Sequence, residues 1–126
     1  MEPLYPLRFT PIFQPRIWGG RRLGELFNWT LPGDGPIGEA WVLSDRDEYP
    51  SRVADGPWQG QTLHQLLQSM PQQLLGKHAE RYPRFPLLLK FLDARDTLSV
   101  QVHPSDQHTD LLPPGECGKF YPRHPW

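Results

Sequence analysis

The sequence predicts a mainly β domain of the jelly-roll or β-sandwich type, with a small helical insertion near residues 62–76. Two observations lead to this prediction. Apolar runs of strand length recur along the chain and are separated by proline, glycine and aspartate turn signals. Helical periodicity is confined to one stretch in the middle of the chain. The 126 residues suffice for one domain, and the 16 prolines are scattered as loop and strand-end punctuation rather than gathered in a polyproline linker.

The first half of the chain consists of short segments. They are a proline-interrupted run over 1–22, a helical turn over 23–29, a strand over 37–45, and a strand with a turn over 52–61. Paired glycines at Gly19 and Gly20 permit a tight turn at the end of the first run, because glycine has no side chain to clash. Asp55 and Gly56 give the turn signal in the fourth segment.

The helical insertion shows start and stop signals. Thr62 is suited to cap a helix, with Gln65 three residues on completing a capping box. Pro71 fits the first turn of a second short helix, and Gly76 fits its end. We expect an apolar stripe to pack in the core: Leu63, Leu66, Leu67 and Met70. His64 lies among polar neighbours, so we expect it to be exposed.

The second half predicts a hairpin. The apolar run 86–94 and the alternating stretch 98-LSVQVH-103 are separated by a turn, so we expect them to pair as antiparallel strands. Strand side chains alternate between faces, which places Ser99, Gln101 and His103 on one face and the leucine and valines on the other. Residues two apart on a strand are about 7 Å apart, so the amide and imidazole side chains can reach one metal ion. A solvated sheet face is the alternative reading of this pattern.

Composition excludes several classes of function. The net charge is −1, which gives no basic surface for nucleic acid or an anionic membrane. The longest apolar run is interrupted by Lys90, so no membrane span is expected, and the proline-rich start does not resemble a signal peptide. The single cysteine, Cys117, rules out an intrachain disulfide framework and suits a reducing compartment. We therefore expect a cytoplasmic protein.

The order of the motifs is more specific than any one of them. The series runs 9-FTPIFQPRIWGG-20, 37-IGEAWVLSD-45, 53-VADGPWQGQTLHQLL-67, 86-PLLLKFLDARDTLSVQVHPSD-106 and 118-GK-119. In this order the motifs resemble type I mannose-6-phosphate isomerase (phosphomannose isomerase), a cupin-fold family that uses zinc to interconvert mannose 6-phosphate and fructose 6-phosphate. The resemblance implies a cupin-like fold, a zinc ion that polarises the sugar oxygens, and a sugar-phosphate substrate.

The resemblance also implies roles for individual residues. Gln101 and His103 match two zinc ligands of the family, and Lys119 matches a lysine that faces its active site. Ser99 matches a serine near the substrate, and we assign Trp18 and Glu39 to substrate binding because they match the family's W-G-G and G-E-x-W motifs. A plain sheet hydroxyl and a surface lysine are the alternative readings of Ser99 and Lys119, and a role in shaping the fold alone is the alternative for Trp18 and Glu39.

The likeness stops abruptly after Lys119. In the family a glutamate ligand follows two residues later, where this chain has Tyr121, and the fourth ligand lies much further along. We therefore expect a truncated, incomplete cupin-like domain over residues 1–119 with a divergent tail over 120–126, carrying half of the metal site. Unpaired strand edges in such a domain favour self-association. A non-catalytic cupin-like module for binding or assembly is the alternative function.

Overall fold

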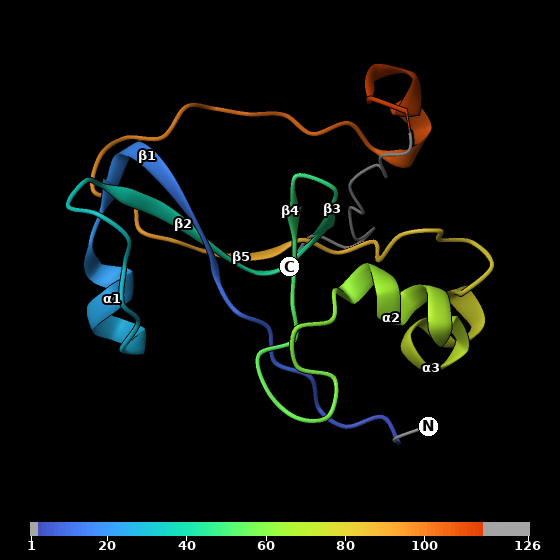
Figure 1. Ribbon diagram of the computed structural model, residues 1–126. Coiled ribbons are helices and arrows are strands. Elements are labelled where there is room, and N and C mark those ends of the chain that lie inside the picture. The colour runs from blue at the N-terminus through green and yellow to red at the C-terminus, as the bar shows by residue number, and fades with distance from the viewer. Residues whose placement is uncertain (1–2, 115–126) are drawn as a thin grey trace, which may run out of the picture.

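The computed structural model describes residues 3–114. Its main feature is a three-stranded antiparallel sheet with the strand order β1-β2-β5, formed by β1 (Ile12–Gly20), β2 (Ile37–Leu43) and β5 (Leu89–Leu92). Two strands of two residues each, β3 (Asp45–Arg46) and β4 (Tyr49–Pro50), form an antiparallel pair soon after β2. The prediction of a mainly β fold is confirmed. In Figure 1 the sheet lies on the left and the helical insertion on the lower right.

The helical segments are short. They are α1 (Arg22–Phe27), α2 (Leu63–Ser69), α3 (Pro71–Leu75) and two 3₁₀ turns, η1 (Gly76–His78) and η2 (Asp106–Leu111). Thr62 and Gln65 form the predicted capping box at the start of α2, and Pro71 stands in the first turn of α3. The helical insertion is therefore confirmed. Each helix in residues 3–114 is too short or too polar to cross a lipid bilayer.

Two small cores hold these elements together. The first lies between α1 and one face of the sheet, where Leu23 packs against Ile37 and Ala40. The aromatic rings of Phe27 and Phe91 meet there with their centroids 4.6 Å apart. The second core lies under the helical insertion and comprises Val53, Trp58, Leu66 and Met70, with Tyr5, Leu7, Phe9 and Leu74 packed around them. The whole predicted stripe of the insertion is buried.

The two faces of the sheet differ in polarity. The register pairs Phe13 with Ala40 and Ala40 with Phe91 on the face that packs against α1. On the opposite face Gln14 pairs with Glu39, and Trp41 pairs with Lys90. Directly opposite residues on neighbouring strands share a face. Gln14 and Glu39, two of the buried polar residues, therefore lie together on the face away from α1.

The strand β1 was not predicted, because the prolines and glycines of residues 11–20 argue against a strand. The structure accommodates Pro15 at a register shift between Gln14 and Pro15, and β1 is an edge strand. Proline is tolerated at such positions because a ladder hydrogen bond is already missing there. A Cβ atom on Gly19 would lie 2.5 Å from the Cα atom of Gly38, so glycine permits the close approach of β1 and β2.

The predicted hairpin is wrong. β5 pairs with β2 instead of with residues 98–103, and that stretch is extended but belongs to no strand. The reason lies in the turn after β5, where the backbone N–H groups of Arg95 and Asp96 donate to the carbonyl oxygen of Trp18 at 2.8 and 3.0 Å. These bonds turn the chain toward the end of β1, and the following residues run separately from the sheet across the top of Figure 1. Val100 and Val102, expected on the sheet face opposite Gln101 and His103, are 97% and 87% exposed.

Leu66 tests the second core. The residue is 2% exposed, so we expect Leu66→Ala to lower the free energy of unfolding by about 2–5 kcal/mol through lost contacts and a cavity. Leu26→Ala, at an exposed position of α1, is the matched control and is expected to change it by less than about 0.5 kcal/mol. Urea unfolding followed by circular dichroism measures both, and equal losses would contradict this description of the core.

Candidate functional site

Three of the predicted site residues lie on the stretch between β5 and η2, whereas Trp18 lies on β1 and Glu39 on β2. Ser99, Gln101 and His103 are all exposed. The side-chain amide nitrogen of Gln101 lies 3.3 Å from the hydroxyl oxygen of Ser99, to which it donates. This contact agrees with the prediction that residues two apart point the same way, although the segment is not part of a sheet.

Both ends of this stretch are held by the rest of the chain. At its start, the turn over 93–96 is bonded to the Trp18 carbonyl, and the carboxylate of Asp93 accepts a hydrogen bond of 2.8 Å from the backbone N–H of Arg22. At its end, Asp106 in η2 lies 3.7 Å from the guanidinium of Arg81. Trp18, predicted to bind substrate, therefore acts through its backbone to position the segment that carries the predicted ligands.

Glu39 is the centre of the polar sheet face. It is 6% exposed, and its carboxylate accepts a hydrogen bond of 2.7 Å from the indole N–H of Trp41. The ammonium of Lys90 lies 3.2 Å from the other carboxylate oxygen, and the guanidinium of Arg16 lies 3.5 Å away. A buried carboxylate with three donors from three strands is fully paired.

Two cations stand around this one carboxylate. Lys90 also lies over the ring of Trp41, with its ammonium 5.6 Å from the ring centroid. The group formed by Arg16, Glu39 and Lys90 carries a local excess of positive charge, which suits a ligand with anionic and hydroxyl groups. Lys90 was not predicted to belong to a site. The signal that could have identified it is the presence of a lysine inside the apolar run 87-LLLKFL-92.

A second charged cluster surrounds Asp45, which is buried. Its carboxylate lies 3.0 Å from the imidazole Nδ1 of His64 and accepts a hydrogen bond of 2.8 Å from the backbone N–H of Phe85. The prediction that His64 is exposed is wrong, because the imidazole is half-buried against this carboxylate. The cluster joins α2 to β3 and to the segment that leads into β5.

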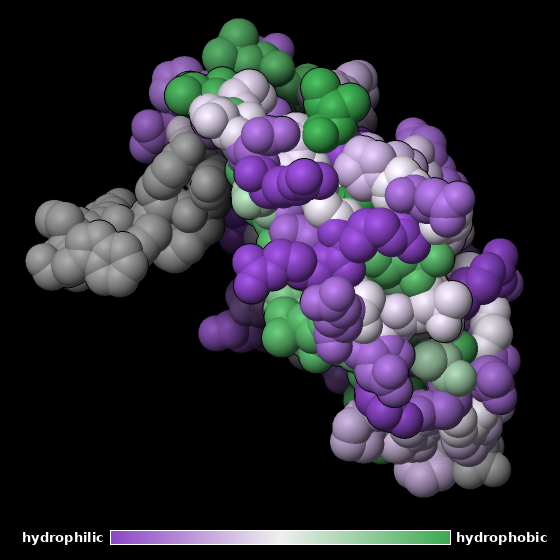
Figure 2. Space-filling model, turned by 90° about the vertical axis from the view of Figure 1, so that its left-hand side faces the viewer, coloured by the Kyte–Doolittle hydropathy of each residue, from purple (hydrophilic) through white to green (hydrophobic). Residues whose placement is uncertain are grey.

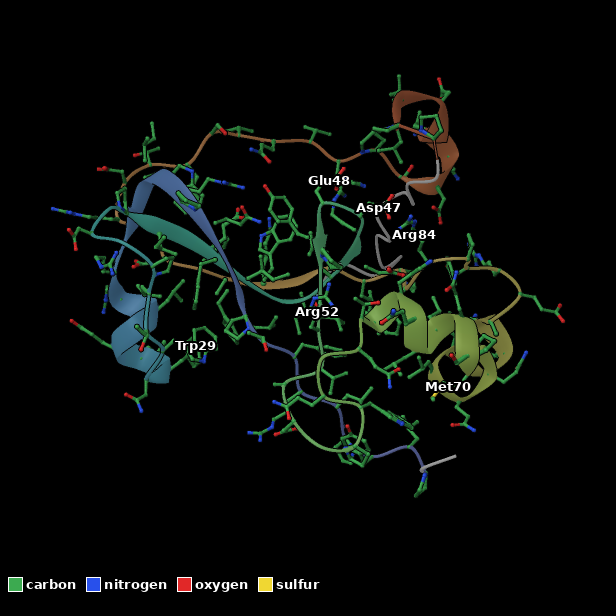
Figure 3. All side chains as sticks on the ribbon, viewed as in Figure 1. Trp29, Asp47, Glu48, Arg52, Met70 and Arg84 are labelled. Carbon is green, nitrogen blue, oxygen red and sulfur yellow. The ribbon has the colours of Figure 1, made fainter. Side chains whose placement is uncertain are left out.

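Arg84 extends the Asp45 cluster to the surface. Its guanidinium donates to the carboxylate of Asp47 at 2.6 Å and to the carbonyl oxygen of Asp45 at 2.8 Å. The hydrogen bond to Asp47 raises the pKa of Arg84 above its ordinary value, so the guanidinium stays charged. Figure 3 shows Arg84 beside Asp47, close to β3 and β4. Sequence spacing gave no signal for this cluster, since its members are far apart in the chain.

A hollow in the described residues lies elsewhere. It has a volume of about 680 Å³ and is bordered by the end of β1, the start of α1 and the turn after β5. Arg21 lines it, but the guanidinium is engaged with the carbonyl oxygen of Gly35 at 2.7 Å. The predicted ligands Gln101 and His103 do not line this hollow. We therefore place the site by its chemistry rather than by this hollow.

The metal site is incomplete in the described part of the chain. No group of three or more histidine, cysteine, aspartate or glutamate side chains within residues 3–114 is arranged to hold a metal ion. The amide oxygen of Gln101 and the imidazole of His103 are groups of the kind that zinc accepts, and as predicted ligands they number two. The other predicted site residue, Lys119, lies outside the described residues, as does Tyr121.

The fold matches solved structures of one class of protein. The crystal structure of the mannose 6-phosphate isomerase from Bacillus subtilis superposes with a TM-score of 0.78 at 37% identity, covering 90% of this chain and 35% of that chain. A mannose 6-phosphate isomerase bound with zinc and yttrium superposes with a TM-score of 0.68 at 26% identity, covering 83% of this chain and 26% of that one. The chain thus has the mainly β, cupin-like fold of these isomerases.

The sequence identifies the family. Residues 6–124 match the family of the phosphomannose isomerase type I catalytic domain, and the chain belongs to it. The mannose-6-phosphate isomerase ManA of Bacillus subtilis (strain 168) is 41% identical over 114 residues, which cover 90% of this chain and 35% of ManA. The chain therefore spans about a third of the length of this relative. The boundary at residue 119 stays a prediction.

Substitution of Glu39 tests whether its carboxylate stabilises the polar sheet face. We expect Glu39→Gln to lower the free energy of unfolding by about 1–3 kcal/mol, because the charge that pairs Lys90 and Arg16 is lost from a buried position. Glu48→Gln, at an exposed position, is expected to change it by less than about 0.5 kcal/mol. Equal stability of the two variants in urea unfolding would show that the buried carboxylate does not organise the sheet.

Proposed function

We propose that the chain forms part of a zinc-dependent mannose-6-phosphate isomerase, in which mannose 6-phosphate and fructose 6-phosphate are interconverted. The family match over residues 6–124 carries the proposal. Relatives that cover most of this chain bear the name of this activity. Because the chain spans about a third of ManA, the activity of the whole enzyme is proposed and not the activity of these residues alone.

Gln101 and His103 are the proposed zinc ligands. The Gln101 amide nitrogen is engaged with Ser99, which leaves the amide oxygen as the free end of the carboxamide for a cation. A related isomerase has been crystallised with zinc, so zinc is the metal that we assign. When bound, the ion would polarise the oxygens of the sugar as a Lewis acid. Two ligands are fewer than the three that a catalytic zinc usually has, so further ligands must join them.

The polar sheet face is the proposed substrate-binding surface. Arg16 and Lys90 would attract the sugar phosphate, and Glu39 would hold both cations in place. Ser99 would contact the substrate beside the metal ligands, and Trp18 would border it. Lys119 remains the proposed catalytic residue by its resemblance to the family motif. A cytoplasmic location belongs to the same proposal, because the substrate is a phosphorylated sugar.

A non-catalytic role in assembly is the second candidate, and one observation favours it. Large apolar side chains are exposed just before β5, along it and in the stretch after it: Leu87, Leu88, Leu89, Phe91, Leu92, Leu98, Val100 and Val102. The outer edge of β5 is unpaired within residues 3–114. Figure 2 shows a face on which polar residues predominate and apolar residues gather in patches, most of them toward the upper end. Exposed strand edges and apolar patches favour self-association.

His103 tests the isomerase. We expect the purified chain to bind zinc weakly, and His103→Ala to lower the affinity by more than about tenfold, since even the partners of metal ligands contribute 10–100-fold. His78→Ala, at an exposed position of η1, is the control and should leave the affinity unchanged. Zinc content and mannose 6-phosphate isomerisation are measured on the same samples. Zinc binding that is lost in His103→Ala supports the proposed ligand, whereas no zinc binding and no turnover favour the assembly role.

Val100 and Val102 test self-association. We expect the wild-type chain to associate with rising concentration, and the double variant Val100→Asp, Val102→Asp to remain monomeric over the same range, because charge opposes burial of these positions. Leu26→Asp, on the exposed side of α1, serves as the control. Sedimentation velocity measures the mass of each species. A monomeric wild-type chain at high concentration would remove the support for the assembly role.

A further inference from the structure

Gln14 carries a buried polar group that the fold does not use. The residue is 4% exposed, and its side-chain amide nitrogen has no hydrogen-bond partner among the described residues. Buried donors in folded proteins are nearly always paired, because an unpaired donor loses its hydrogen bonds to water on folding. A buried amide without a partner therefore needs an explanation. A side chain of leucine or methionine would fill the same space without this cost.

The position of Gln14 suggests what the amide is for. In the register of the sheet Gln14 lies directly opposite Glu39, so the two side chains share the polar face and their Cβ atoms are about 4.5–5.5 Å apart. The carboxylate of Glu39 is bonded to Trp41 and Lys90 on the same face. The face thus holds an unused amide donor beside a carboxylate acceptor, with an aromatic ring next to them.

This pair of groups fits a hydroxyl. A hydroxyl group accepts a hydrogen bond from an amide N–H and donates its own proton to a carboxylate, so one hydroxyl satisfies both side chains. A phosphate dianion has no proton to donate and would be repelled by Glu39. Sugars present hydroxyl groups together with apolar C–H faces, which suits the ring of Trp41. The phosphate of a sugar phosphate would then face Arg16 rather than this pair.

We propose that Gln14 is a sugar-binding residue whose amide donates to a hydroxyl group of the substrate, while the same hydroxyl donates to Glu39. This inference rests on the proposed function. The amide nitrogen is covered in the structure, so the hydroxyl reaches it when a neighbouring side chain moves. On this face Lys90 is partly exposed and its ammonium is bonded to Glu39, the residue opposite Gln14. The substrate phosphate offers that ammonium a second anionic partner.

The side-chain amide signals of Gln14 test this role in the wild-type chain. They are assigned in a nitrogen-15 correlation spectrum by comparison with Gln14→Leu. Mannose, mannose 6-phosphate and inorganic phosphate are then added in separate titrations. We expect the Gln14 amide protons to shift with both sugars and not with inorganic phosphate. The exposed amides of Gln72 and Gln73 in α3 are the internal controls and should not move.

Gln14→Leu provides the second measurement. Because the amide nitrogen has no partner among residues 3–114, we expect the Tm of this variant to be equal to or above that of the wild type. We expect its affinity for mannose 6-phosphate to fall about tenfold, the effect of losing one hydrogen bond. A variant with a clearly lower Tm would overturn the proposal, because the amide would then serve the fold.

Two further outcomes overturn the proposal. Either the Gln14 amide signals stay still while other residues report sugar binding, or no residue reports binding of either sugar. These outcomes are separate from a failure of the proposed isomerase, which is decided by zinc content and by turnover in the His103→Ala experiment. Gln14→Glu keeps the size of the side chain and removes the donor. It is expected to weaken sugar binding as Gln14→Leu does, and unchanged affinity in this variant would also contradict the role.

Discussion

The carboxylate of Glu39 joins the three strands of the sheet through one buried charge. Its partners come from β1, β2 and β5: Arg16, Trp41 and Lys90. A buried carboxylate is costly without such donors, so the charge requires that all three strands be in register at once. The same requirement assembles two cations and an indole on one face. Structural order and ligand chemistry therefore depend on the same group, and neither can be changed without the other.

The sequence predicted most of the local structure, because local signals determine it. The capping box at Thr62 and the proline at the start of α3 were read directly from residue type and spacing. The pairing of β5 was not predicted. Alternation in residues 98–103 indicated a strand, but the turn before it is bonded to Trp18, more than seventy residues earlier. A long-range backbone hydrogen bond leaves no pattern in a sequence, so no feature of the sequence argued against the hairpin.

The stretch that carries Ser99 and Gln101 was predicted more fully than the polar sheet face. The spacing of Ser99 and Gln101 predicted that they point the same way, and their hydrogen bond agrees. Their metal and substrate roles came from the resemblance to a family and stay predictions. On the polar sheet face only Glu39 was predicted, because the other residues come together only through the register of three strands. Lys90 looked like an interruption of an apolar run until β5 was placed against β2.

The contact of the N-terminal segment with the second core has a kinetic consequence. Tyr5 donates a hydrogen bond of 2.9 Å to the carbonyl oxygen of Asp55, across a separation of 50 residues, and its ring stacks at a tilt on Trp58. Contacts of such long range form late, because a large loop must close before they stabilise anything. Helix α2, by contrast, carries its own cap and can form early. We therefore expect the helical insertion to be only partly formed, with one side exposed to solvent, until the first residues of the chain pack against it.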